Sequence, residues 1–315
     1  MGEKMTTGIA YGKALAEFGP KSEVYVLDAD VSSCTMSIEF AKICPERFFN
    51  MGIAEANMAG AAAGIATCGG AAVIHTFAIF AAGRIYDQVR NSIAYPGLNV
   101  KIAGTHAGFT NGKDGATHQS IEDISLMREI PGMTVLVPCD SNETRLAVKA
   151  MLEMKGPCYI RLGHTEVDTV TDQIPGYHYE IGKGAQLKEG TDVTIIACGL
   201  MVQMALAAAE MLDKEGIHAR VIDMHTIKPI DRECILKAAK ETGAIVTAEM
   251  HSVLGGLGSA AAEVLTEECL VPLERVGVED RFGHSATTEE LFEKYGLTAE
   301  NIVKHAKCAI ERKKN

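Results

Sequence analysis

The strongest restriction on the fold is a regular alternation of short apolar segments with amphipathic segments along residues 1–165. Val24–Leu27 and Ala72–His75 have the length and composition of buried strands, whereas Thr7–Phe18 and Ala54–Thr67 have the periodicity of helices. Strands that alternate with helices pair in parallel, because the chain crosses over the sheet between them. The first part of the chain is therefore predicted to be α/β, with a mainly parallel sheet flanked by helices.

The same alternation continues to the end of the sequence with one interruption. Residues 166–190 contain Pro175 and four glycines, which is typical of a linker. We therefore expect two α/β domains, at residues 1–165 and 191–315, each with a mainly parallel sheet flanked by helices. The further expected elements are helices at 37–44, 79–94, 121–130, 142–154, 201–215, 232–242, 258–268 and 299–312, and strands at 47–51, 99–103, 134–137, 158–161, 193–197, 219–222, 244–247 and 273–278.

Charge and cysteine content exclude several classes of protein. The formal net charge of −11 disfavours nucleic acid and anionic membrane surfaces as partners. The nine cysteines are odd in number and form no CxxC pair, so we expect neither a disulfide framework nor a zinc site, and a cytoplasmic location fits best. The apolar stretch at residues 59–82 is interrupted by glycines and His75, so we expect buried helix, turn and strand there and no membrane span.

Two segments contain side chains that packing alone does not require. Glu55 lies at a strand-to-helix junction, although a first-turn carboxylate also simply favours the helix dipole. Phe77 and Phe80 lie three residues apart in a chain with 5% aromatic residues. They form either an ordinary core pair or a platform for a flat heterocycle.

A third segment is the glycine-rich loop at residues 104–123, which holds His106, Asp114 and His118 between a strand and a helix. Loops on α/β scaffolds commonly carry functional side chains, although Asp and Thr here would also suit a helix cap. The spacing of these residues lacks the helical ligand pair typical of metal sites, so we assign no metal ligand to this chain.

Taken in order, these segments resemble the transketolase family. The resemblance rests on AYGKAL, LDADVSS, ERFFNMGIAEAN, HTFAIFAAGRIYDQVRNSIAY and the loop GTHAGF…DGATHQSIEDISLMR, with GGLGSA near His251 in the second domain. It covers nearly the whole chain and implies a thiamine diphosphate pyrimidine-binding domain followed by a transketolase C-terminal domain. The chain would then be the C-terminal-half subunit of a split transketolase, which moves a two-carbon ketol unit from a ketose to an aldose acceptor.

The resemblance also implies roles for individual residues. Glu55 matches the glutamate that activates the cofactor, because a carboxyl group hydrogen-bonded to the aminopyrimidine favours the tautomer that removes the thiazolium proton. Phe77 and Phe80 match the aromatic platform under the aminopyrimidine. The remaining matches are cofactor contacts at Asp30, Val31 and Ile53, and substrate contacts at His106, Asp114 and His118, of which the two histidines are also catalytic.

The metal-diphosphate half of the family's site has no counterpart in this sequence. The family holds Mg²⁺ and the diphosphate through a GDG motif in another domain, and no GDG occurs here. The resemblance therefore implies that thiamine diphosphate and its Mg²⁺, or Ca²⁺, are completed by an N-terminal-half partner subunit. Because most oligomers close with two-fold symmetry, we expect a heterotetramer with two copies of each chain.

The sequence departs from phosphosugar transketolases at three substrate positions. The family's Arg, Ser and Arg around the substrate phosphate align with Gly8, Cys34 and His164. Loss of two guanidinium groups weakens the grip on a phosphate dianion, whereas a singly charged sulfonate needs fewer cations. A sulfonated ketose such as 6-deoxy-6-sulfofructose, a phosphorylated ketose such as xylulose 5-phosphate, and a neutral sugar all remain open.

Two other functions remain open. The β subunit of a 2-oxo acid dehydrogenase has a similar size and plan, although the DGATHQSIED loop favours transketolase. A non-catalytic scaffold subunit would only stabilise its partner, and it would need neither Glu55 nor the loop histidines.

Overall fold

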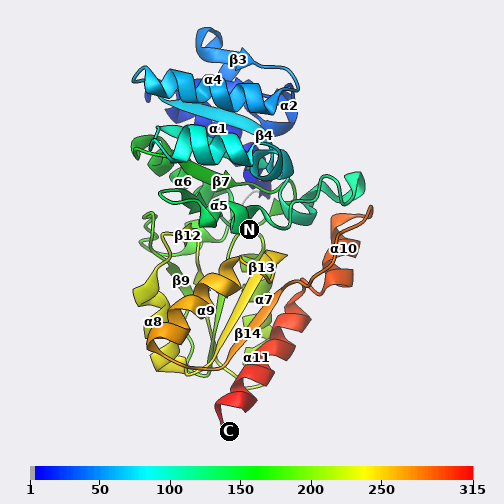
Figure 1. Ribbon diagram of the computed structural model, residues 1–315. Coiled ribbons are helices and arrows are strands. Elements are labelled where there is room, and N and C mark those ends of the chain that lie inside the picture. Colours follow the sequence, from blue (N-terminus) through cyan, green and yellow to red (C-terminus); the bar gives the residue numbers. More distant parts are fainter. Residues whose placement is uncertain (1–3, 315) are drawn as a thin grey trace.

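The computed structural model describes residues 4–314 and contains two large sheets, which follow one another along the length of the molecule (Figure 1). The first sheet is parallel except for β12, which runs antiparallel to β6. Its seven strands, in spatial order, are β12 Thr226–Lys228, β6 Thr134–Leu136, β7 Cys158–Arg161, β5 Val100–Thr105, β4 Ala72–Phe77, β2 Tyr25–Asp28 and β3 Phe48–Asn50.

Helices cover both faces of the first sheet, because successive residues of a strand point to opposite sides. Val26 and Val73 pack with the helices of one face, whereas the next residues, Leu27 and Ile74, pack with those of the other. The first face carries α1 Thr7–Phe18, α3 Ile38–Ala41 and α6 Ser141–Glu153, and the second carries α4 Glu55–Thr67, η2 Phe80–Arg84, η3 Gln88–Ala94 and α5 Asp123–Glu129.

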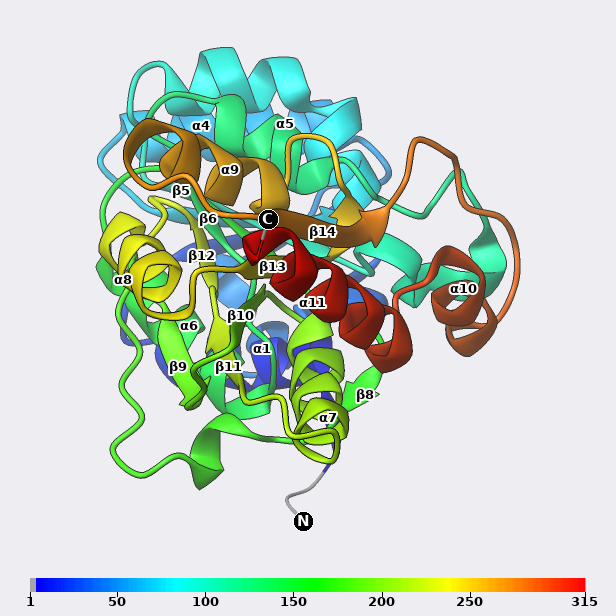
Figure 2. The same ribbon diagram turned by 90° about the horizontal axis from the view of Figure 1, so that it is seen from below.

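The second sheet is flanked in the same way. Figure 2 shows α7 Met201–Asp213 and α11 Ala299–Lys313 on one side of it, with α8 Arg232–Thr242 and α9 Leu257–Glu268 on the other. The strand at one edge, β9, is antiparallel to its neighbour, and the others are parallel. In spatial order the strands are β14 Leu273–Val278, β13 Ile245–Ser252, β10 Val193–Ala197, β11 Ala219–Asp223 and β9 Ala185–Lys188.

Side chains from the second part of the chain bind the first. The strand β12 completes the first sheet, and Lys228 at its end donates from Nζ to the carbonyl oxygens of Arg128 (2.8 Å) and Ile130 (2.6 Å) at the end of α5. One hydrophobic cluster also includes residues of both sheets, among them Ile74 and Ile196. The two units therefore share a continuous apolar core.

The α/β class with two mainly parallel sheets is confirmed, and several expected elements need correction. Residues 79–94 were expected to be one α-helix, but they form the π-helical segments η2 and η3, since apolar spacing does not detect one extra residue per turn. The expected linker 166–190 contains β8 Glu166–Val167, η5 Thr171–Gln173 and the sheet strand β9. The boundaries 1–165 and 191–315 remain our proposal, and β12 crosses between them. No helix among residues 4–314 has both the length and the apolarity that a bilayer crossing requires.

Candidate active site

The predicted site residues, apart from Gly8, lie at or just beyond the carboxyl ends of strands in the first sheet. Because β3, β2, β4, β5 and β7 are parallel neighbours, these ends meet along one edge of the sheet. Ligands of open α/β sheets bind at this edge. In strand order the residues are Ile53 and Glu55 after β3, Asp30, Val31 and Cys34 after β2, Phe77 and Phe80 at the end of β4, His106, Asp114 and His118 after β5, and His164 after β7.

Five of these side chains form one aromatic cluster. The rings of Phe77 and Phe80 are stacked with their centroids 6.1 Å apart, and the edge of His118 meets Phe80 at 5.3 Å. His106 lies 4.5 Å from Phe77, and its other side stacks on His164 at 4.2 Å. Side chains from the ends of β4, β5 and β7 thus form a flat apolar surface with imidazole groups at its border.

Glu55, the first residue of α4, lies beside this surface and is only 4% exposed. Arg84 donates from Nη1 to Glu55 Oε1 at 2.7 Å, and its guanidinium carbon lies 3.9 Å from the centre of the Phe80 ring. Arg84 was not among the residues predicted from the sequence. The spacing of Phe80 and Arg84, four residues apart in an expected helix, was a usable signal, since side chains at that spacing are neighbours.

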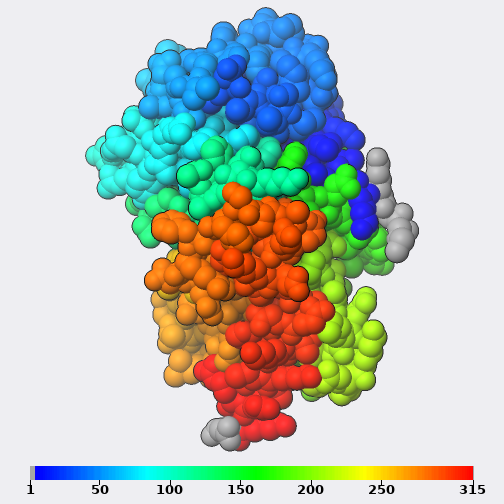
Figure 3. Space-filling model, turned by 90° about the vertical axis from the view of Figure 1, so that its right-hand side faces the viewer, coloured from blue at the N-terminus to red at the C-terminus, as the bar shows by residue number. Residues whose placement is uncertain are grey.

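The loop after β5 is braced by the second unit. Its segment η4 Gly108–Asp114 packs against α10 Thr288–Tyr295, and Gln119 Nε2 donates to the carbonyl oxygens of Gly112 and His284, both at 2.9 Å. Figure 3 shows the orange segment around α10 lying against the green loop. Asp114 is exposed at the end of η4, and no described interaction connects it with the aromatic cluster.

His106 is neutral at physiological pH. Burial and, to a smaller extent, the charge of the neighbouring His164 lower its pKa to about 4. Its φ of +56°, like the +65° of Asp30, lies in the left-handed region that favours glycine, and such strained residues cluster at functional sites. His106 can therefore offer one hydrogen bond to a ligand from a fixed position, but no positive charge.

The three departures from the phosphosugar pattern lie in different environments. Gly8 is buried, and its amide donates to the carbonyl oxygen of Gly163 at 3.2 Å, which places it next to His164. This hydrogen bond occupies the amide of Gly8, so that amide is not available to an anion. Cys34 is exposed on the short helix α2 Ser32–Thr35.

The predicted cofactor contacts after β2 and β3 are connected through Asn50. Its side chain donates from Nδ2 to Asp30 Oδ1 at 2.7 Å and accepts from the amide of Gly52 at 3.0 Å. The amide of Val31 donates to Asp28 at 2.7 Å, which fixes the turn after β2. Ile53 is 78% exposed at this edge.

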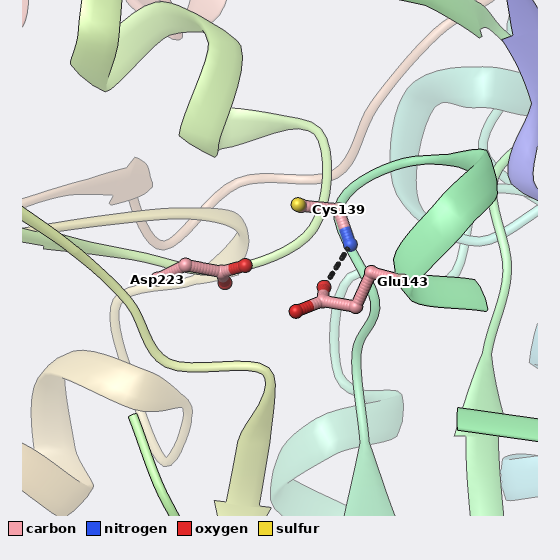
Figure 4. A group of neighbouring side chains, drawn as sticks. All are labelled: Cys139, Glu143 and Asp223. Carbon is pink, nitrogen blue, oxygen red and sulfur yellow. Dashed lines mark hydrogen bonds between the residues drawn. The ribbon is translucent and has the colours of Figure 1, made fainter. Parts of the chain in front are cut away.

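A second buried polar group, Cys139, Glu143 and Asp223, lies where α6 meets β11 (Figure 4). Glu143 accepts from the amide of Cys139 at 2.7 Å and from the hydroxyl of Tyr177. Burial raises the pKa of Asp223 well above its usual range, and the nearby charge of Glu143 raises it further. The protonated form of Asp223 is therefore favoured, and within residues 4–314 neither of its carboxyl oxygens has a hydrogen-bond partner.

The edge around Glu55 fits the pyrimidine half of thiamine diphosphate. Glu55 Oε2 has no donor among the described residues and is available to a ring nitrogen, while Phe77 and Phe80 provide a flat apolar face. Within residues 4–314, the one close group of three potential metal ligands is the Cys139 group. The side chains near Glu55 thus match the organic ring of the cofactor.

Comparison with known proteins identifies both units. The transketolase pyrimidine binding domain matches residues 3–169, and the transketolase C-terminal domain matches residues 182–302. The chain is 48% identical to the 6-deoxy-6-sulfo-D-fructose transketolase subunit SqwH of Clostridium sp. (strain MSTE9), over 96% of this chain and 94% of that protein. It is 40% identical to an apulose-4-phosphate transketolase subunit of Phocaeicola vulgatus, over 90% of each.

A solved structure described as a split gene transketolase, inactive beta4 tetramer, is 54% identical and covers 98% of this chain and 99% of its own, with a TM-score of 0.91. The family depends on thiamine diphosphate and transfers aldehyde or ketone groups. The two domain matches follow one another along the chain, and the end-to-end matches are to proteins described as separate subunits. Both findings lead to the same assignment. The chain therefore belongs to the transketolase family, as the C-terminal-half subunit of a split transketolase.

Proposed function

We propose that this chain supplies the pyrimidine-binding side of the ketol-transfer site, with Glu55 as the cofactor-activating carboxylate. The observation that carries the proposal is a carboxylate with 4% exposure directly beside the stacked Phe77–Phe80 pair at the ligand-binding edge of the sheet. When bound, thiamine diphosphate supplies the electron sink for cleavage of a carbon–carbon bond. Glu55 holds the proton at the ring nitrogen, and the phenylalanines orient the ring and exclude water from it.

The remaining site residues are assigned to the sugar and the cofactor. His106 and His118, at the border of the phenylalanine surface, donate or accept hydrogen bonds at the substrate's oxygens, and the exposed Asp114 binds a hydroxyl further out. Asp30, Val31 and Ile53 contact the cofactor from the ends of β2 and β3. Positioning of this kind contributes to rate by holding the reacting groups in line.

We also propose that a separate N-terminal-half subunit completes the site and holds the diphosphate with Mg²⁺ or Ca²⁺, in an assembly of two copies of each chain. The ring-binding residues described here, and the relative described as an inactive beta4 tetramer, support this proposal. The lone chain should show no ketol transfer with thiamine diphosphate and Mg²⁺, and addition of the partner should restore it. Activity of the lone chain, or a stable one-to-one complex with full activity, would contradict this assembly.

For the substrate we propose a ketose whose far end is a sulfonate. Gly8, Cys34 and His164 replace two guanidinium groups and a hydroxyl, and His106 is neutral beside His164. A relative with 48% identity is named for 6-deoxy-6-sulfo-D-fructose, which supports a sulfonate. The relative named for apulose 4-phosphate is 40% identical, so a phosphorylated ketose is the second candidate.

The reconstituted enzyme decides between these substrates through kcat/KM for 6-deoxy-6-sulfofructose, fructose 6-phosphate and xylulose 5-phosphate. Two missing charge-assisted contacts at ~1.5–3 kcal/mol each should cost the phosphosugars at least about a hundredfold. Gly8→Arg with His164→Arg should restore phosphate selectivity, and a Cβ atom added at Gly8 would lie at an ordinary 3.4 Å from its nearest neighbour, the carbonyl oxygen of Gly163. The exposed His178→Arg, which adds the same charge elsewhere, is the control. Phosphosugars that react a hundredfold faster than the sulfonate would refute the sulfonate and leave the transketolase activity intact.

A further inference from the structure

Arg84 contacts two members of the proposed cofactor site at once. Its side chain is 46% exposed, yet one end of the guanidinium lies 2.7 Å from Glu55 Oε1 and its plane covers the Phe80 ring at 3.9 Å. The π-helical segment η2 begins at Phe80 and ends at Arg84, and it sets the two side chains on the same side of the chain. A π-helical turn is uncommon and occurs frequently at functional sites.

Glu55 depends on this contact. Within residues 4–314, Arg84 is the one donor to its carboxylate, although the group is almost fully buried. An ionised carboxylate in such a place is strongly unfavourable without a partner. The bond to Oε1 also fixes the rotation of the carboxylate, so that Oε2 remains for a second donor.

We propose that Arg84 is the positioning residue of Glu55: it fixes the carboxylate against the Phe80 platform and, by its permanent charge, sets how the proton is divided between Glu55 and the ring nitrogen it faces. A cation beside a carboxylate favours the ionised form. Arg84 therefore shifts the shared proton toward the heterocycle, which is the side where it is needed to favour the reactive tautomer. The inference rests on the proposed role of Glu55 and adds a residue that the role alone does not require.

The Arg84 side chain also has two separable functions. Its charge acts on Glu55, while its planar surface packs on Phe80, and lysine keeps only the first. Methionine keeps the packing volume and loses the charge. Arg84→Lys and Arg84→Met therefore distinguish an electrostatic role from simple packing, and Arg90→Met, an exposed arginine one segment later that bonds Asn91, controls for the loss of one charge.

The test is a double-mutant cycle on exchange of the thiazolium C–H proton in the reconstituted enzyme. Arg84→Met should slow exchange by about tenfold or more, with Arg84→Lys recovering most of the rate and Arg90→Met unchanged. In the Glu55→Gln background, Arg84→Met should have less than about a twofold further effect, because the two act as a unit. Equal losses in both backgrounds would overturn the positioning role. No effect of Glu55→Gln by itself would instead refute the proposed function of Glu55.

A second measurement uses the chain without cofactor. In urea unfolding of the isolated chain, Arg84→Met should lower the midpoint, because it leaves the Glu55 carboxylate buried without its donor, whereas Arg84→Lys should retain most of the wild-type midpoint. In the Glu55→Gln background, Arg84→Met should have a smaller effect on the midpoint, because the two side chains act as a unit. Equal shifts of the midpoint in both backgrounds would show that Arg84 does not act on the carboxylate.

Discussion

His106 combines burial, a left-handed backbone conformation and a lowered pKa, so protonation of its imidazole destabilises the folded chain. Its pKa of about 4 lies below the ordinary 6.5, so between these values the unfolded chain binds a proton that the folded chain does not. His106 therefore does not reduce the free energy of unfolding above about pH 6.5, and it reduces this free energy progressively as the pH falls toward 4.

We expect His106→Asn to weaken this pH dependence in the isolated chain. Asparagine tolerates the left-handed conformation better than most residues, so the backbone is retained. Urea unfolding near pH 7 and near pH 5 should show that the wild type loses about 2 kcal/mol more than His106→Asn over this interval. The exposed His178→Gln should retain the wild-type slope, and an equal slope in His106→Asn would show that His106 is not held neutral by the fold.

Most of the residues that the structure brings together around Glu55 were candidates from the sequence, and those that were not have a physical reason. Glu55, Phe77, Phe80 and the two loop histidines lie in continuous runs that follow strands, and those runs are visible in the sequence. Arg84 reaches Glu55 across 29 residues, and only the folded sheet brings the two together. The lowered pKa of His106 was also not predictable, since it results from burial against His164.

Among the elements, the contact between α1 and the end of α2 depends on one small residue. A Cβ atom at Gly12 would lie 2.5 Å from Met36 Cβ and 2.7 Å from the Met36 carbonyl oxygen. Gly64 in α4 has no such neighbour, because nothing lies within 4 Å of a Cβ added there. The same substitution should therefore have opposite effects in the two helices.

We expect Gly12→Ala to lower the free energy of unfolding by about 1–2 kcal/mol, since overpacking outweighs a gain in helix propensity of about 1 kcal/mol. Gly64→Ala should raise it by about 0.5–1 kcal/mol. Urea unfolding of the two variants of the isolated chain measures both effects. Stabilisation by Gly12→Ala would show that α1 and α2 do not approach this closely.

Long elements with clear ends were predictable, and short ones were not. The helix α1 and the strands β7, β10 and β14 have the predicted bounds. The start of α1 is marked in the sequence by Thr6, whose side chain caps the helix. The strand β12 has three residues before Pro229, too few for a periodic pattern. The helix α10 was not expected either, although its capping box from Thr287 to Glu290 was a readable signal.

For the whole molecule, a buried ion pair joins the two units. Arg161 at the end of β7 donates from Nε to Asp123 Oδ2 at 2.7 Å and from Nη2 to the carbonyl oxygen of Met250 in β13 at 2.9 Å. Asp123 also accepts from the hydroxyl of Tyr159 at 2.7 Å. The guanidinium thus connects the first sheet with the second through groups that are almost fully buried.

We expect Asp123→Asn to destabilise the chain by about 3–5 kcal/mol, because it leaves Arg161 as an uncompensated buried charge. Glu17→Gln, which breaks the exposed pair with Arg145, should cost less than about 1 kcal/mol. Unfolding free energies give the comparison, and hydrogen exchange in Asp123→Asn should increase in β13. Similar small losses in both variants would mean that the Arg161 contacts do not hold the units together.

The position of β12 at the edge of the first sheet has a consequence for synthesis on the ribosome. The other six strands of this sheet have all been synthesised once Arg161 is translated, but β6 keeps an unpaired edge until Lys228 has been translated. Unpaired strand edges pair with other chains and lead to aggregation, so the nascent chain is prone to aggregate during this interval of its synthesis. A gene split between the codons for Arg161 and Lys228 would encode a first chain in which the edge of β6 stays unpaired. Such a chain would be prone to aggregation, so the segment between the two sheets is an unfavourable position for dividing this enzyme into two chains.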